Sequence, residues 1–302
     1  YQSCLVVEKV ANRVEYKKQH FITASYLKAW RDPKTPNGAF VWTVSKTNRT
    51  IRRKSPKSLF SEEDFYTYYD ANGNRVIKVE HQLHEIEDKF INIRNHKLQN
   101  NKTLLAEDRR NIAQFISAMF ARTKRQKEEG QQIWQEYLAS IETLSPEQSR
   151  AIKQTLDYQQ VASLHKEQPM PFSLSFFINM ATPFLSQMNF KIFKTTSSPG
   201  FITSDNPCFI YDPRIHLGGL PASWHELFSS PSVMILLPVS PKLAIQLEWH
   251  GIDGYIALDK YLEDEKEMVD ALNNFTATNS DEIIVVNQKT FNESWFDEKI
   301  PF

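Results

Sequence analysis

The sequence predicts an α+β fold, in which a helical layer packs on a largely antiparallel sheet. Helical periodicity is concentrated in residues 80–188, whereas short strand-like runs separated by turn residues fill 189–290. Helices and strands that are grouped in this way, rather than alternating, are typical of α+β proteins. Of the 302 residues, 41% are hydrophobic and 12% aromatic, which indicates a folded chain with a substantial core.

We expect residues 1–302 to form a single domain, because no linker, repeat or low-complexity tract divides the chain. Its length alone would also be compatible with two domains of ordinary size. Within the domain we distinguish a strand-containing N-terminal part, 17–79, a helical middle, 80–188, and a sheet-rich C-terminal part, 189–290.

The N-terminal part is predicted to contain one short helix and four strands. The helix runs from Gln19 to Trp30 and ends at the Pro of Arg31-Asp32-Pro33. Asn-Gly at positions 72 and 73 indicates a hairpin turn between the last two strands. The predicted strands are 40–44, 51–54, 64–69 and 75–79.

The middle part is predicted to be helical throughout. Apolar residues from Val79 to Ile93 recur at spacings of four and three, which marks one face of a helix. A second helix begins near Ala106 and either continues through the basic residues 122–127 or breaks at Gly130. Ser145-Pro146 is a helix start, with Ser as the cap and Pro in the first turn. A last helix, 174–188, is kinked or cut by Pro183.

In the C-terminal part, the sequence pattern changes from that of helices to that of strands. Short apolar runs are separated by turn residues, and one helix, 263–275, interrupts them. The predicted strands are 189–195, 200–203, 208–211, 233–237, 243–249, 255–258 and 283–286.

The strand predicted at 200–203 ends in Ser204-Asp205-Asn206-Pro207. Pro207 lacks a backbone donor and therefore stops the ladder, while Asp and Asn side chains bond nearby backbone groups in turns. Asp205 and Asn206 are thus presented at a strand end, where sites are often built. Use in a turn alone would explain the same residue types.

On the helix that follows Val79, polar side chains lie along the border of the apolar stripe. At about 100° per residue, Glu80, Glu87 and Arg94 fall almost in line, with His84 beside them. Two carboxylates near an imidazole can bind a divalent metal or divide acid and base roles. The alternative is a solvated flank with charge pairs. His20 joins this set only if the fold brings it close.

Charge is unevenly distributed, although the formal net charge is zero. Residues 1–130 contain 25 Lys and Arg against 15 Asp and Glu, a balance of +10, and the remainder has a balance of −10. Two basic stretches could contact nucleic-acid phosphates, or form solvated faces. The candidate contacts to a nucleic acid or nucleotide are Arg49, Arg52, Arg53, Lys54, Lys124, Arg125 and Lys127.

Several classes of protein are disfavoured. The two cysteines, Cys4 and Cys208, form no metal-type or disulfide framework, which fits a reducing cytosol. The longest apolar run, 233–237, is too short to cross a bilayer, and the first residues lack the pattern of a secretion signal. No phosphate-cradling or dinucleotide fingerprint occurs, so ATP hydrolysis and NAD chemistry are poor candidates. We therefore expect a cytoplasmic protein without membrane contacts.

An ordered series of short motifs resembles a known family. The series consists of Gln19 to Leu27, Asp64-Phe65-Tyr66, Glu80 with Glu87, Phe115-Ile116 with Arg122-Thr123, and Phe201 to Pro207. It is similar to the bacterial "domain of unknown function 4238" family over residues 17 to 290. The resemblance implies that six residues occupy matching motif positions: His20, Glu80, Glu87, Arg122, Asp205 and Asn206.

These residue types suggest three functions. The first is a metal-assisted hydrolase that acts on a phosphodiester or nucleotide. Its Mg²⁺ or Mn²⁺ would be held by Glu80, Glu87, Asp205 and His20. Arg122 would stabilise the developing anionic charge, and Asn206 would orient water or substrate. The second is a non-catalytic binding or regulatory module, for example in a bacterial conflict or mobile-element setting, in which the polar cluster is structural. The third is a metal-free carboxylate-pair hydrolase such as a glycosidase.

Overall fold

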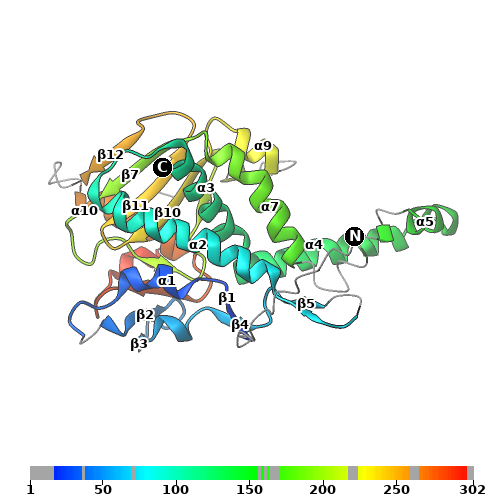
Figure 1. The fold of residues 1–302 in the computed structure, drawn as a ribbon, viewed down its shortest axis with the longest axis horizontal. Helices are drawn as coiled ribbons and strands as arrows, with labels where there is room; N and C mark the ends of the chain where they lie inside the picture. Colours follow the sequence, from blue (N-terminus) through cyan, green and yellow to red (C-terminus); the bar gives the residue numbers. More distant parts are fainter. Residues whose placement is uncertain are drawn as a thin grey trace, which may run out of the picture.

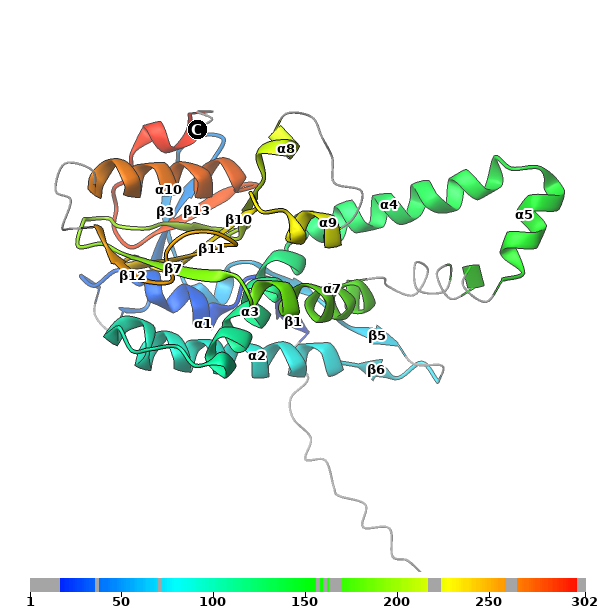
Figure 2. The same cartoon turned by 90° about the horizontal axis from the view of Figure 1, so that it is seen from above.

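The larger sheet forms the middle layer of the main body (Figure 2). The computed structural model describes residues 17–35, 38–69, 72–155, 158–159, 162, 170–216, 224–258 and 265–297; Cys4 lies outside these ranges. All neighbours in this sheet are antiparallel except β12 and β7, which run parallel. The strand order is β12 (Gly254–Ala257), β7 (Asn189–Lys194), β11 (Leu243–Glu248), β10 (Met234–Ser240) and β9 (Phe209–Tyr211).

Helices cover both faces of this sheet. Helix α10 (Glu265–Asn279) lies on one face, and α2 (Lys78–His96), α3 (Ala106–Ala121) and α7 (Met170–Leu185) lie on the other (Figure 2). Alternate residues of β10 divide between the two layers: Ile235 and Leu237 pack with the three helices, whereas Leu236 packs with α10. Successive side chains of a strand point to opposite faces of the sheet, so β10 is buried on both sides. The predicted α+β class with a helical layer is confirmed.

The helical layer matches the apolar patterns of the sequence. On α2, the residues that recur at spacings of four and three are buried, except Ile86, which is partly buried, and Phe90 stacks on Phe115 of α3 at a centroid distance of 3.7 Å. Pro183 lies inside α7, near its end. The largest apolar cluster includes residues from all three predicted parts of the chain, from Phe21 to Val285.

A second sheet joins the N-terminal part to the C-terminal part. Its order is β3 (Ile51–Lys54), β2 (Val41–Ser45), β13 (Ile283–Val286) and β8 (Thr203–Ser204), all antiparallel. Two small pairs complete the strands that the structure describes: β1 (Lys18–His20) with β4 (Ser61–Glu63), and β5 (Tyr68–Tyr69) with β6 (Arg75–Val76). The Asn-Gly hairpin predicted from the sequence is confirmed by the last pair.

The second helix was expected either to continue through the basic residues 122–127 or to break at Gly130. The structure shows a third arrangement, a break before these residues end. Helix α3 stops at Ala121, and α4 (Lys124–Glu142) begins after Thr123, whose hydroxyl accepts a hydrogen bond from the backbone N of Gln126 at 3.3 Å. This cap starts a new helix, and Gly130 lies inside it. Helix α5 (Pro146–Lys153) starts at its predicted Ser145 cap. Helices α4 and α5 project from the body (Figure 1).

Two predicted elements are corrected by the structure. The helix expected over Gln19 to Trp30 is replaced by strand β1, helix α1 (Ala24–Leu27) and a 3₁₀ turn at Lys28–Trp30, because Gln19 pairs with Glu62 of β4. The strand expected at 200–203 is reduced to β8. The preceding peptide groups are bonded outside a ladder: Asn273 donates to the carbonyl of Gly200 at 2.9 Å, and the backbone N of Phe201 donates to the carbonyl of Pro241 at 2.9 Å.

The remaining helices are short. Those with described bounds are α8 (Pro213–His216), α9 (Trp224–Ser229) and 3₁₀ turns at Pro56–Ser58, Leu98–Asn100 and Glu293–Phe296. Within the described part of the chain, no helix combines the length and the apolar character needed to span a bilayer.

Candidate functional site

A buried ion pair connects α2 with the residue that follows α3. Nη1 of Arg122 donates to Oε1 of Glu87 at 2.6 Å, and the two residues are 1% and 6% exposed. A buried charge is strongly unfavourable without a partner, so each of these groups depends on the other. The pair is therefore the fixed centre of the candidate site.

The second oxygen of Glu87 is also occupied. Oγ1 of Thr23 donates to Oε2 of Glu87 at 2.7 Å. Thr23 is the N-cap of α1, and its Oγ1 accepts from the backbone N of Ser25 at 3.3 Å. One carboxylate thus links the start of α1, the middle of α2 and the end of α3.

Arg122 has donors that this carboxylate does not reach. Its Nη2 contacts Sδ of Met119 at 3.0 Å, and its buried Nε has no hydrogen-bond partner within the described chain. Burial lowers the pKa of Arg122, but Glu87, Tyr66 and Glu80 together raise it by more, so the net shift is upward. The guanidinium therefore stays charged.

His20 lies at the end of β1, partly exposed beside this pair. Its Nε2 lies 3.2 Å from the carbonyl oxygen of Lys57. Because a carbonyl only accepts, Nε2 must hold the hydrogen, which leaves Nδ1 as the unprotonated nitrogen of the neutral ring. Burial lowers the pKa of His20 below its usual 6.5, while Lys57 and the charge of Glu87 act in the opposite direction. The ring is thus a neutral proton acceptor at pH 7.

Glu80 lies one helical turn before His84, which bridges it to Glu87. Nε2 of His84 is 3.9 Å from Oε1 of Glu80, and Nδ1 of His84 is 3.7 Å from Oε2 of Glu87. Burial raises the pKa of Glu80 above its usual value, and Glu87 adds to this shift, whereas His84 opposes it. Glu80 therefore keeps a proton to higher pH than an exposed carboxyl does.

Tyr66 connects the strand and the helix that hold these groups. Its hydroxyl lies 3.4 Å from the carbonyl oxygens of both His20 and Arg122, and burial raises its pKa well above the usual 10. Sequence reasoning did not assign Tyr66 or Thr23 to the site. Both occur within the motifs that gave the family resemblance, which is the signal that could have identified them.

Four of the six predicted residues therefore lie together. His20 interacts electrostatically with Glu87 and Arg122, and Glu80 interacts with the same pair. The site consists of one buried ion pair, in which both oxygens of Glu87 accept hydrogen bonds from the fold, and two titratable groups at its edge. Such an arrangement can position an acid and a base beside a fixed charge pair.

Asp205 and Asn206 lie at a different place, the connection between α10 and β13. The carboxylate of Asp205 accepts from the backbone N of three successive residues, 281, 282 and 283, at 2.9, 2.7 and 2.9 Å. Nδ2 of Asn206 donates to the carbonyl of Asn279 at 3.2 Å, and Nδ2 of Asn279 donates back to the carbonyl of Asn206 at 2.9 Å. Burial raises the pKa of Asp205 to about 6, against the effect of its three donors.

The four predicted metal ligands consequently do not form one ligand set. Asp205 is hydrogen-bonded to the turn after α10, and both oxygens of Glu87 accept hydrogen bonds from Arg122 and Thr23. In the residues that the structure describes, no group of three or more His, Cys, Asp or Glu side chains is arranged to hold a metal ion. Of the predicted ligands, His20 and Glu80 have atoms that are not already bound to the fold.

Several of the predicted nucleic-acid contacts are paired within the protein. Arg49, Arg125 and Lys127 each contact a carboxylate, and Arg49 also lies over the ring of Phe296 at 3.7 Å. Lys124 is exposed, 4.0 Å from a carboxylate one turn further along α4. The partners of the first three are Glu293 at 3.4 Å, Asp281, and Glu62 at 3.5 Å.

The other three basic residues lie on strand β3. Arg52, Arg53 and Lys54 are exposed, and β3 is an edge strand of its sheet. Charged side chains on an edge strand prevent another strand from adding to it, so this position has a structural reason of its own. Binding of a polyanion here stays a prediction.

Comparison with known proteins identifies the family. The model of a family described as "Protein of unknown function (DUF4238)" matches residues 18–290, which include the ion pair, His20, Glu80 and the Asp205 turn. The chain belongs to this family, as its ordered motifs predicted. Neither the curated proteins nor the solved structures give a match.

Proposed function

We propose that this member of the DUF4238 family is a cytoplasmic hydrolase that cleaves a phosphodiester or nucleotide by general acid–base catalysis. The observation that supports it is the pair of titratable groups beside the Glu87–Arg122 ion pair. His20 is a neutral base whose tautomer is fixed by the carbonyl of Lys57, and Glu80 is a carboxyl with a raised pKa. Groups with pKa values shifted by burial and by specific charges occur preferentially at functional sites.

In the proposed reaction, Nδ1 of His20 accepts a proton from water as the oxygen attacks phosphorus. Glu80 gives its proton to the leaving oxygen as the bond to phosphorus breaks. The Glu87–Arg122 pair holds α2 and the end of α3 in place, so it positions the two proton-transfer groups. The buried thiol of Cys208 fits the reducing compartment that we propose.

The basic N-terminal part of the sequence supports a phosphate-containing substrate, because it can attract a polyanion. A required Mg²⁺ or Mn²⁺ would be held by Glu80 with His20 or His84, since the oxygens of Glu87 already accept hydrogen bonds. Carboxylate oxygen and imidazole nitrogen are suitable ligands for these ions.

The test is a hydrolysis assay of the purified protein. Bis-(p-nitrophenyl) phosphate, dinucleotides and nucleoside triphosphates are assayed with Mg²⁺, with Mn²⁺ and with EDTA, and p-nitrophenyl glycosides serve the carboxylate-pair alternative. We expect phosphodiester or nucleotide cleavage that His20→Gln or Glu80→Gln reduces by about 10²–10⁴-fold. Glu107→Gln, a matched change at the exposed start of α3, should leave the rate unchanged. Equal rates for all three variants would refute the assignment.

The pH profile gives a second readout of the same proposal. His20 must be neutral to act as a base, so the rate should fall when the pH drops below its pKa, which lies under 6.5. Glu80 must be protonated to act as an acid, so the rate should also fall as the pH rises through its pKa, which lies above 4.5. His20→Gln should remove the acid limb. A pH-independent rate from pH 4 to 8 would contradict this pair.

A second candidate function, a non-catalytic binding or regulatory module, is favoured by one observation. Glu87, Asp205 and Asn206 are all hydrogen-bonded within the fold, as expected of structural groups. On this proposal no substrate is cleaved under any condition above. Substitutions in the cluster would then lower the melting temperature and nothing else.

A further inference from the structure

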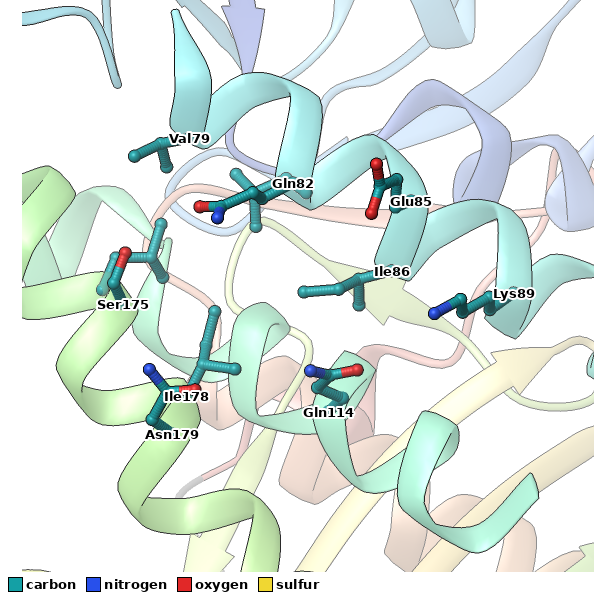
Figure 3. A pocket seen from close by; sticks show the side chains of 11 residues that line it. Val79, Gln82, Glu85, Ile86, Lys89, Gln114, Ser175, Ile178 and Asn179 are labelled. Atoms are coloured by element: carbon teal, nitrogen blue, oxygen red, sulfur yellow. The ribbon is translucent and has the colours of Figure 1, made fainter. Parts of the chain in front are cut away.

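A groove lies on another side of α2, between α2 and α7 and over α3 (Figure 3). It has a volume of about 260 Å³. Val79, Leu83 and Ile86 of α2 and Ile178 of α7 supply apolar lining. Polar side chains from all three helices complete it, so a ligand would contact both apolar and polar surface.

The groove continues along α7 into a second hollow. Gln114 of α3 and Asn179 of α7 line both, and the second has a volume of about 290 Å³. Arg110 is the only charged residue that lines the second hollow among the described residues. In the first, Glu85 and Lys89 supply one charge of each sign. The two hollows are therefore adjacent, and together we call them the channel, which has an apolar section and a section beside a single cation.

Three of the four carboxamides that line this channel are not used by the fold, whereas Nε2 of Gln187 donates to the carbonyl of Pro183 at 2.8 Å. Gln82, Gln114 and Asn179 form no hydrogen bond with any residue that the structure describes, and neither does the guanidinium of Arg110. Each carboxamide offers two donors and an acceptor. Three such groups, on three helices around one channel, are therefore available to a ligand.

The chemistry of the lining selects among ligand classes. No aromatic side chain lines either hollow in the described chain, so the stacking surface that sugars and bases use is missing here. A helical ligand would have its backbone groups already paired. An extended peptide has free N–H and C=O groups that match carboxamides, and an apolar side chain that matches the first hollow.

We propose that the channel between α2, α3 and α7 binds an extended peptide segment, with an apolar residue in the first hollow and a carboxylate beside Arg110. The carboxylate is either an acidic side chain or a C-terminus. This site is separate from the proposed hydrolytic site, because none of His20, Glu80, Glu87 and Arg122 lines either hollow.

Fluorescence anisotropy with the full chain tests the proposal. Three fluorescein-labelled peptides are compared: Gly-Gly-Ile-Ser-Asp-amide, Gly-Gly-Ile-Ser-Gly with a free C-terminus, and Gly-Gly-Ile-Ser-Gly-amide. We expect one of the first two to bind about tenfold more tightly than the third, and the tighter one identifies the source of the carboxylate. Arg110→Ala should abolish this difference, whereas Arg150→Ala, an exposed change on α5, should preserve it.

The carboxamides provide the second arm of the test. Gln114→Ala and Asn179→Ala should each weaken binding of the tighter peptide by about tenfold, with unchanged melting temperatures. Ser175→Trp, which fills the first hollow, should abolish binding. Failure of all three peptides to bind at 1 mM would overturn the proposal, as would equal affinity for all three or binding unaffected by the Gln114 and Asn179 substitutions. None of these results depends on hydrolytic activity.

Discussion

Helix α2 contributes to two polar regions whose side chains are used in opposite ways. Towards α1 and the end of α3, both oxygens of Glu87 accept hydrogen bonds, from Arg122 and Thr23. Towards α7, the carboxamide of Gln82 has no partner in the described chain. Polar groups that are bonded inside the fold stabilise it, and their removal leaves a partner unsatisfied. Polar groups that stay available can bind a ligand at little cost to stability.

The largest difference between the two regions should appear when Glu87 is truncated. Glu87→Ala leaves the buried guanidinium of Arg122 without its counter-charge, which costs about 3–5 kcal/mol of unfolding free energy. Urea denaturation followed by circular dichroism measures this loss. Gln114→Ala in the groove should change the same quantity by less than about 0.5 kcal/mol.

A double substitution separates the charge from the shape of the pair. Glu87→Leu combined with Arg122→Met replaces the ion pair by apolar groups, and should recover most of the stability that either single change removes. If the double variant is as unstable as the sum of the single variants, the cost lies in packing and not in the unpaired charge.

The next largest effect should come from Asp205, which is bonded like Glu87 although it lies elsewhere. Asp205→Asn replaces one acceptor oxygen by a donor that faces backbone N–H groups, so unfolding free energy should fall by about 1–3 kcal/mol. Asn179→Ala is the matched change at an unbonded amide, with no measurable loss. If Asp205→Asn is as stable as the wild type, the hydrogen bonds of Asp205 do not stabilise the fold, and this prediction is wrong.

The smallest effect is expected at the half-exposed basic residues. Arg125→Ala removes contacts with Asp281 and with the carbonyl of Asn279, and should cost about 0.2–1 kcal/mol because such pairs are screened by solvent. Lys124→Ala, one residue earlier, is the control for the change in unfolding free energy, because the ammonium of Lys124 lies 4.0 Å from its nearest carboxylate. If Arg125→Ala instead weakens binding of a labelled oligonucleotide while leaving stability unchanged, the predicted polyanion contact at this residue gains support.

Much of the fold could be predicted because it depends on local pattern. The stripe of apolar residues from Val79 to Ile93 predicted α2, and the helix start at Ser145-Pro146 predicted α5. Strand β1 could not be predicted in this way, since Gln19 is extended only because it pairs with Glu62, far along the chain. The Thr123 cap was not predicted, because the basic residues after it do not distinguish a new helix from a continued one.

The residues of the candidate site also differ in whether local sequence pattern could identify them. The carboxylates and His84 of α2 could be placed together from helical spacing, and motif order added His20 and Arg122. Asp205 could not be assigned, because its three donors lie more than 70 residues further along the chain. The groove carboxamides follow no sequence pattern, and only the packing of three helices brings them to one channel.

The most direct test of the division between bonded and available groups is one pair of matched substitutions on α2. Glu80→Gln and Glu87→Gln are the same chemical change, about two turns apart on one helix, and urea denaturation gives the unfolding free energy of each. We predict that Glu87→Gln loses about 2–4 kcal/mol, because it removes the charge that pairs with buried Arg122. Glu80→Gln should stay within about 0.5 kcal/mol of the wild type or be more stable, since burial already disfavours its charged form. Equal losses, or a larger loss for Glu80→Gln, would contradict the account.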